Sequence, residues 1–260
     1  MISLAFVNNK GGCGKTTGIF QISGVLAERG QRVLVIDLDG QCNATSTLLG
    51  NSSIPDKTIY DVLTGAASVE DAIAPAMYAS KGCRNMTEHG IDCVAGDSRL
   101  LDSNVFASFG LDFIDALRLY ESAYDVVLID LPPSNSGANS VGFRLADKVI
   151  VPMTSADMYA INGVGKISDT VESMRHNFNE TLEIVGVYFS NYFESPVQSF
   201  VVDCLRGGQV RLLKTKIPRS SAVTISTVNA RPLAAYAPNE KATIAYEALT
   251  DEIMRIMKGE

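Results

Sequence analysis

A glycine-rich segment near the start of the chain has the residue types of a phosphate-binding loop. It reads KGGCGKTT over residues 10–17 and lies between an apolar run, 2–8, and a stretch with helical spacing. Glycines let the backbone turn tightly and point successive N–H groups inward, and a helix start adds its positive dipole end. Lysine and threonine beside such a cradle suit phosphate oxygens and Mg²⁺. The pattern predicts a nucleotide-phosphate site formed by Gly11, Gly12, Cys13, Gly14, Lys15, Thr16 and Thr17, with the Thr16 hydroxyl as a magnesium ligand.

The loop departs from the ordinary P-loop pattern at two positions. Asn9 stands six residues before Lys15, where the ordinary pattern has glycine, and a second lysine, Lys10, opens the loop. Charge that develops on a transferred phosphoryl group has to be neutralised, so Lys10 and Lys15 are both candidate catalytic residues. A glycine-rich turn with incidental lysines is the alternative interpretation. The strand expected before the loop and the helix expected after it favour the phosphate site.

Aspartates end two further apolar runs. Asp37 and Asp39 come at the end of the second run of the chain, and Asp130 comes at the end of a later one. Two acids at positions i and i+2 of a strand end both leave the sheet at the edge where the phosphates would lie. A hydrophobic strand that ends in Asp is the Walker B arrangement, so Asp130 is expected to complete the magnesium site through water or the Thr16 oxygen. A helix cap is the alternative role for Asp37 and Asp39.

These motifs need elements that bring them to one edge of a sheet. Short apolar runs alternate with segments of helical spacing, which predicts an α/β fold: a single doubly wound, mostly parallel β-sheet flanked by helices, as in P-loop NTPases. Residues 50–90 show only weak helical segments, and no linker divides the chain, so residues 1–260 are expected to form a single domain. The expected strands are 2–8, 32–38, 91–95, 125–131, 148–152, 182–190 and 210–216, and the expected helices are the segment between the first two strands, 109–121, 137–146, 159–178 and 239–258.

Composition excludes several broad classes of protein. Of the 260 residues, 46% are apolar and 20% are charged, which excludes a disordered or fibrous chain. No apolar stretch approaches the ~20 residues of a membrane span. The chain has 5 cysteines and no CxxC pair, which suits a reducing compartment, so we expect a cytoplasmic protein. The net charge of −7, taken as an average, argues against a chain coated with nucleic acid.

The motifs together resemble a known family. The loop with Lys10, the DLDG segment and the strand that ends at Asp130 are similar to those of the deviant Walker A ATPases, which include the ParA and Soj partition proteins, MinD and the nitrogenase iron protein. The resemblance implies that Lys10 reaches across a nucleotide-sandwich dimer to the partner's phosphates. It also implies that Asp39 orients the attacking water and that Asp37 contributes to the magnesium water shell. The family usually has Pro where Gly40 stands, so a freer loop is expected here.

The C-terminal part of the chain resembles the partition branch of this family. The segments IPR and RPL, residues 217–219 and 231–233, are similar to a segment of the partition ATPases that begins Ile-Pro-Arg and ends Gly-Lys-Pro. The resemblance implies that Asn191, Pro218 and Arg219 border the adenine, and that basic residues of this region bind DNA nonspecifically. Three positions depart from the common Arg, Glu and Pro of the family, namely Ala222, Ile225 and Thr227.

Charge is distributed unevenly along the chain. Residues 204–238 contain six basic residues and no Asp or Glu, so removing their +6 from the net charge of −7 leaves −13 for the rest. Such segregation indicates a basic face for the phosphate backbone of DNA, and a solvated face without a ligand is the alternative. The candidate DNA-binding residues are Arg206, Arg211, Lys214, Lys216, Arg219 and Arg231.

Other branches of the family agree less well with the residues. MinD-like proteins end in a basic amphipathic helix, whereas residues 251–260 carry more anions than cations, so no membrane partner is expected. The nitrogenase iron protein needs a cluster-ligating cysteine shortly after Walker B, where this chain has Leu131 and prolines. The tyrosine cluster of the bacterial tyrosine kinases is absent. The loop begins too early for the N-terminal helix-turn-helix extension of other partition proteins.

The sequence therefore predicts a ParA/Soj-like ATPase with ATP and Mg²⁺ as cofactors. It is expected to form an ATP-dependent homodimer that binds DNA nonspecifically, associates with the nucleoid in that state, and hydrolyses ATP slowly until a ParB-type centromere-binding adaptor stimulates it. The alternative is a positioning or scaffold ATPase that localises a protein cargo or envelope machinery without binding DNA. The acidic pI and the residues Ala222 and Ile225 favour this alternative. An ATPase that delivers metal clusters or electrons is a third hypothesis.

Overall fold

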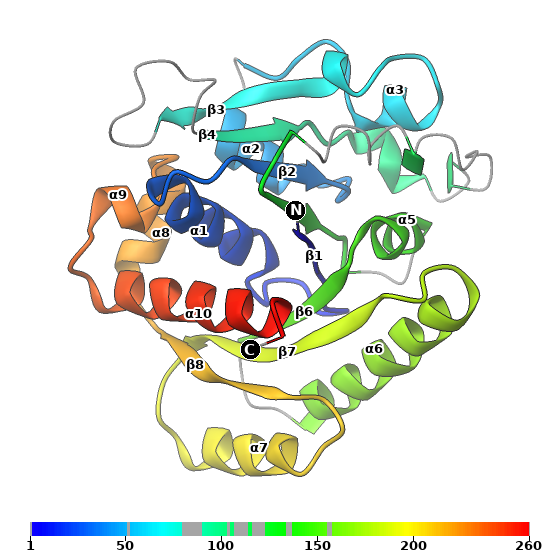
Figure 1. The fold of residues 1–260 in the computed structure, drawn as a ribbon. Coiled ribbons are helices and arrows are strands. Elements are labelled where there is room, and N and C mark those ends of the chain that lie inside the picture. Colours follow the sequence, from blue (N-terminus) through cyan, green and yellow to red (C-terminus); the bar gives the residue numbers. More distant parts are fainter. Residues whose placement is uncertain are drawn as a thin grey trace.

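Parallel strands form the centre of the structure (Figure 1). The computed structural model describes residues 2–50, 53–79, 90–102, 105–106, 114–115, 123–133, 137–154 and 158–259. In this part of the chain, an 8-stranded sheet has the order β3-β4-β2-β5-β1-β6-β7-β8, and neighbouring strands are parallel except for β3 and β4. The predicted fold class is thus confirmed. The strands are β1 (Ile2–Phe6), β2 (Val33–Asp37), β3 (Ile73–Ala79), β4 (Gly90–Val94), β5 (Val126–Asp130), β6 (Lys148–Met153), β7 (Glu183–Tyr192) and β8 (Leu212–Pro218).

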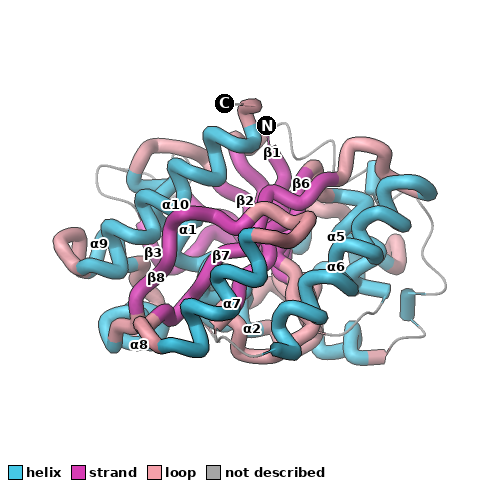
Figure 2. Tube along the Cα trace, turned by 90° about the horizontal axis from the view of Figure 1, so that it is seen from below, coloured by secondary structure: helices cyan, strands magenta, loops and turns pink. Residues whose placement is uncertain are grey.

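Helices cover both faces of the sheet (Figure 1 and Figure 2). One apolar core receives buried residues from α1 (Lys15–Glu28), α2 (Asn43–Leu49), α9 (Leu233–Tyr236) and α10 (Lys241–Met257). The second core receives them from α3 (Ile59–Leu63), α5 (Gly137–Leu145), α6 (Met158–Asn177) and α7 (Pro196–Arg206). The remaining elements are α8 (Ser221–Val228) and the 3₁₀ helices η1 (Glu70–Ala72) and η2 (Ser98–Leu101). As far as the chain is described, none of its helices combines the length and apolar character that crossing a bilayer requires.

The residues of the central strands alternate between the two cores. Leu4 and Phe6 lie in the core with α1, whereas Ala5 and Val7 lie in the core on the other face. This alternation follows because successive Cβ atoms of a strand point to opposite faces of the sheet. The continuous apolar runs of the sequence are therefore strands that are buried on both faces.

The carboxyl ends of the parallel strands meet at one edge of the sheet. In the register of the sheet, Asp130 at the end of β5 is the partner of Asp37 at the end of β2 and of Phe6 at the end of β1. In open parallel sheets, the loops that follow the strand ends are the usual position of a ligand site. The sheet thus brings the glycine-rich loop after β1 and the two acids to the same edge.

Most of the predicted elements are present, and one region is wrong. All the expected strands occur, with ends shifted by one or two residues, as do the helices expected at 137–146, 159–178 and 239–258. The helix expected at 109–121 lies outside the described residues except for 114–115. The prediction of weak helical segments in residues 50–90 is wrong at 73–79, which form the strand β3 and pair antiparallel with β4. Pro75 argues against a strand because proline lacks an N–H group, yet it is tolerated here because β3 lies at the edge of the sheet.

Candidate nucleotide-binding site

The loop between β1 and α1 turns on two glycines. Gly12 and Gly14 have φ values of 70° and 91°, in the left-handed region that disfavours side chains. A Cβ atom on Gly14 would also lie 2.7 Å from Ser190 Oγ, near the end of β7. The Ser190 hydroxyl donates a hydrogen bond to the Cys13 carbonyl (2.8 Å), which fixes the loop against the sheet. At Gly14, both the backbone conformation and the close approach require glycine.

The start of α1 is built to receive an anion. Gly14 is the N-cap residue and has no side chain that could accept hydrogen bonds from the first N–H groups of the helix. Residues 11–17 line a cavity of about 440 Å³, so the structure brings together all of the predicted phosphate-binding residues. Lys15 is among them and is 7% exposed. The helix dipole, the loop N–H groups and the Lys15 ammonium together suit phosphate oxygens.

Asp130 is hydrogen-bonded to Thr16 of the cavity lining and has an unused acceptor. Its side chain is completely buried, and its Oδ2 accepts a hydrogen bond of 2.6 Å from the Thr16 hydroxyl. Its Oδ1 has no hydrogen-bond partner. Burial, followed by the nearby charge of Asp37, raises the pKa of Asp130 to about 8. A buried carboxylate oxygen without a donor is costly unless a cation or ordered water compensates it, so Thr16 and Asp130 fit a magnesium site.

Asp37 is occupied by donors from its own chain. Its Oδ2 accepts hydrogen bonds from the Thr45 N–H (2.9 Å) and the Thr45 hydroxyl (2.7 Å), and its Oδ1 accepts one from the Asp39 N–H (3.1 Å). Burial raises the pKa of Asp37 to about 6. In this structure, Asp37 organises the loop after β2. Its expected contribution to the magnesium water shell stays a prediction.

Asp39 and Lys10 lie differently relative to the phosphate cavity. Asp39 lines the cavity and is 6% exposed, and its Oδ1 accepts a hydrogen bond from the Gln41 N–H (3.0 Å). Lys10 is exposed and does not belong to the lining, although it directly precedes Gly11. Its backbone N–H donates to Asn8 Oδ1 (3.0 Å). The structure therefore places Asp39 in the lining of the phosphate cavity and leaves Lys10 exposed outside that lining.

A second cavity of about 540 Å³ continues from the first and shares Gly12, Gly14 and Thr17 with it. The residues expected beside the adenine all line this cavity, so the structure brings Asn191, Pro218 and Arg219 together. A nucleotide with its phosphates in the first cavity would extend its base into the second. Sequence reasoning missed several polar lining residues. Two of them, Thr154 and Ser220, follow the ends of the parallel strands β6 and β8, and that position is a signal that could have found them. The missed residues are Thr154, Ser190, Ser220, Ser221, Thr224 and Tyr246.

The candidate DNA-binding residues follow the edge strand β8. Lys214 and Lys216 lie on β8, with Arg211 just before the strand and Arg219 just after it. Lys216 also packs on Tyr192, with its Nζ 4.2 Å from the ring centre. These four basic residues are thus spread along one edge of the sheet, and Arg219 alone among the six lines the second cavity. The two that remain, at the end of α7 and after α8, are Arg206 and Arg231.

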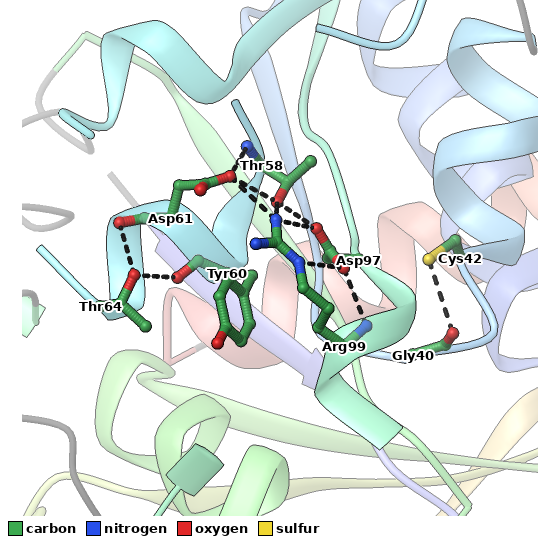
Figure 3. Close-up of polar contacts among 8 residues, drawn as sticks. All are labelled: Gly40, Cys42, Thr58, Tyr60, Asp61, Thr64, Asp97 and Arg99. Atoms are coloured by element: carbon green, nitrogen blue, oxygen red, sulfur yellow. Dashed lines mark hydrogen bonds and ion pairs between the residues drawn. The ribbon is translucent and has the colours of Figure 1, made fainter. Parts of the chain in front are cut away.

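A polar cluster that the sequence analysis did not single out follows β4 (Figure 3). The Arg99 guanidinium contacts Asp97 (2.6 Å) and Asp61 (3.1 Å), and it lies 3.8 Å above the ring of Tyr60. The Thr58 hydroxyl donates to Asp97 Oδ2 (2.7 Å). Partial burial alone would raise the pKa values of Asp61 and Asp97. The hydrogen bonds from Thr58 and Arg99 and the charge of Arg99 outweigh burial and lower both pKa values.

The same segment covers the loop after Asp39. A Cβ atom on Gly40 would lie 2.8 Å from Leu101 Cγ and 2.9 Å from the Leu101 nitrogen. Gly40 is buried, so the glycine at this position serves a close approach. The freer loop expected from the missing proline is therefore not what the packing shows.

We predict that Arg99 contributes a pH-dependent part of the stability. Because the folded pKa values of Asp61 and Asp97 lie below the ordinary value, the cluster stabilises the fold above about pH 4 and loses this effect as pH falls through the folded pKa values. Arg99→Gln should lower the free energy of unfolding by about 1 kcal/mol at neutral pH, since the guanidinium is half exposed.

Urea unfolding at about pH 7 and about pH 3 measures this effect, because the difference between parent and variant should shrink at the lower pH. Arg175→Gln, on an exposed pair of α6 with Glu172, is the matched control and should change little. A deficit of Arg99→Gln that stays constant with pH would contradict the electrostatic explanation.

The fold and this site together define a class of protein. A doubly wound parallel sheet, a glycine-rich loop that leads into α1, and acids at the ends of β2 and β5 are the parts of a P-loop nucleotide-binding protein.

Comparison with known proteins identifies the family within this class. A sequence profile for a family described as an AAA domain matches residues 1–184. The chain is 30% identical over 255 residues to the chromosome-partitioning ATPase Soj of Thermus thermophilus, which covers 96% of this chain and 94% of that protein. It is 34% identical to the chromosome partitioning protein ParA of Caulobacter vibrioides over 73% of this chain and 69% of that protein. The chain therefore belongs to the ParA/Soj family of ATPases.

Solved structures have the same fold. The crystal structure of cobyrinic acid a,c-diamide synthase from Mycobacterium smegmatis with bound ADP and magnesium has a TM-score of 0.82 and 25% identity, over 100% of this chain and 97% of that chain. The cell division ATPase MinD from Pyrococcus furiosus has a TM-score of 0.77 and 23% identity, over 98% of this chain and 99% of that one.

Proposed function

We propose that this partition or positioning ATPase forms a nucleotide-sandwich homodimer that binds DNA nonspecifically and hydrolyses ATP slowly. A ParB-type adaptor stimulates hydrolysis, and the ATP-bound dimer associates with the nucleoid. One observation carries the proposal: Lys15 lies inside the phosphate cavity, whereas Lys10 is exposed outside its lining. A lysine at that place suits the phosphates of a second copy better than those of its own chain. Residues 1–260 act together as one ATPase domain in this proposal.

The residues of the site divide the work of ATP hydrolysis. The loop N–H groups and Lys15 hold the phosphates, while the Thr16 hydroxyl and Asp130 hold the magnesium ion or its water. Magnesium, when bound, neutralises charge on the phosphate oxygens. Asp39 orients the attacking water, and Lys10 of the partner subunit adds positive charge where the transferred phosphoryl group develops negative charge. Asn191, Pro218 and Arg219 border the base.

Lys10→Ala tests the sandwich dimer. ATP binding should stay within about 3-fold, because Lys10 does not line the cavity of its own chain. ATP-dependent dimer formation should be lost, and turnover should fall by about 100-fold or more, as for other groups that act on the phosphates from a partner. Analytical ultracentrifugation with ATP and a phosphate-release assay measure the two effects. Lys166→Ala on α6 is the control, and a Lys10→Ala variant that still dimerises and turns over normally would disprove the sandwich.

Asp39→Ala tests the role of Asp39. Removing its carboxylate should leave ATP binding intact and block hydrolysis, since the phosphate-binding groups remain and the group that orients water is lost. The dimer should then persist in ATP instead of decaying as ATP is consumed. Dimer lifetime after a pulse of ATP, with phosphate release measured in parallel, distinguishes the two states. Hydrolysis at the parent rate would remove Asp39 from this role.

Lys214→Glu tests DNA binding without disturbing the nucleotide. Lys214 is exposed on β8 and lines neither nucleotide cavity, in contrast to Arg219. DNA binding by the parent should require ATP and should weaken as the salt concentration rises. The variant should bind DNA about 10-fold more weakly. The slope of its log affinity against log salt concentration should be smaller by about 1 for each lost phosphate contact. A gel-shift titration at several salt concentrations, with Lys166→Glu as control, provides these values. Absence of binding at low salt would overturn the DNA part of the proposal.

One observation favours the second candidate, a positioning ATPase that localises a protein cargo without DNA. In helix α8 the polar residue Ser226 is buried, while the apolar residues Ile225 and Val228 are 43% and 79% exposed. An apolar exposed face suits a protein contact better than a phosphate backbone. The DNA titration above separates the two candidates, because this one predicts no ATP-dependent DNA binding at low salt.

A further inference from the structure

The hydroxyl of Thr45 connects three segments of the chain near the phosphate cavity. Thr45 lies in the first turn of α2 and is completely buried. Its Oγ1 donates a hydrogen bond to Asp37 Oδ2 (2.7 Å) and accepts one from the Gly96 N–H (2.7 Å). This single group therefore links the end of β2, the start of α2 and the segment after β4.

The other side of Asp37 controls the position of Asp39. Asp37 Oδ1 accepts the Asp39 N–H (3.1 Å), so the orientation of the Asp37 carboxylate sets the backbone at Asp39. Asp39 in turn lines the phosphate cavity. The two oxygens of Asp37 thus divide between Thr45 on one side and Asp39 on the other. A carboxylate held by donors on both sides has little freedom to rotate.

The segment after β4 provides a fixed support for this connection. A Cβ atom on Gly96 would lie 2.9 Å from Asp37 Cγ, so the Gly96 backbone packs directly on the carboxylate. The same segment is anchored by Arg99 through its contacts with Asp97 and Asp61 (Figure 3). Beyond it, Leu101 covers Gly40 on the outer side of the loop.

We infer that Thr45 is a positioning residue for ATP hydrolysis, acting on Asp39 through the carboxylate of Asp37. Thr45 lines neither nucleotide cavity, so its effect passes through the loop and does not involve contact with the nucleotide. The inference rests on the proposed role of Asp39. The segment after β4 also gains a role, because it holds Thr45, which orients the loop that carries Asp39.

Thr45→Val provides the test, because valine keeps the shape of threonine and lacks the hydroxyl. Turnover should fall by about 10- to 100-fold, the usual effect of displacing a catalytic group by about 1 Å, while ATP affinity should stay within about 3-fold. Thr45→Ser keeps the hydroxyl and should restore turnover to within about 3-fold of the parent.

Ser3→Ala is the matched control at the opposite end of the sheet. The Ser3 hydroxyl is buried, donates to Asp147 Oδ2 (2.8 Å) and accepts the Asp147 N–H (2.8 Å), so it repeats the bonding pattern of Thr45 far from the nucleotide. Its removal should lower the melting temperature without changing kcat. A kcat loss in Ser3→Ala equal to that in Thr45→Val would show a general structural effect and overturn the inference.

Asp39→Ala separates this inference from the proposed function. Asp39→Ala and Thr45→Val are compared in the same single-turnover hydrolysis assay, because both changes are proposed to act on the same step. If Asp39→Ala blocks hydrolysis and Thr45→Val does not, only the inference on Thr45 fails. If Asp39→Ala hydrolyses ATP at the parent rate, the proposed role of Asp39 fails, and with it the action of Thr45 through that residue.

Discussion

Two carboxylates buried side by side at the edge of a parallel sheet constrain the rest of this structure. Asp37 and Asp130 are partners in the register of β2 and β5, and both are completely buried. Burying charges of like sign is unfavourable unless hydrogen-bond donors or a cation compensate them. The chain compensates Asp37 with donors from Thr45 and Asp39, and it leaves Asp130 Oδ1 without a partner. One buried carboxylate oxygen of Asp130 is thus left for a donor from outside the chain, which fits a magnesium ion or its water.

This constraint organises the loops around the nucleotide. The loop after β1 forms the anion cradle, and residues at the ends of β7 and β8, with those just after β8, contribute to the second cavity that continues from it. The loop after β2 is held from beneath by Asp37 and from outside by Leu101. A conformational change that begins at the phosphate cavity can therefore be transmitted to Asp39 and to the segment after β4 through these existing contacts.

Some features were predictable because their information is local. The loop residues 10–17 are contiguous, so the strand, the cradle and the helix that carry the phosphate chemistry follow one another along the chain. Continuous apolar runs identified the central strands in the same way, because strands of this composition are buried on both faces. The edge strand β3 escaped prediction because Pro75 breaks the local strand pattern, and only its place at the edge of the sheet makes the proline tolerable.

The sequence by itself determined the chemistry of this protein: a phosphate cradle, acids at two strand ends, and a parallel α/β class to carry them. The tertiary structure decided how distant residues cooperate. It placed β2 between β4 and β5, which brings Gly96 to Thr45 and Asp37, and it placed four of the six basic residues on or directly beside β8. These relations depend on strand order, and strand order follows from how the whole sheet packs its helices. A local pattern of residues does not contain that information.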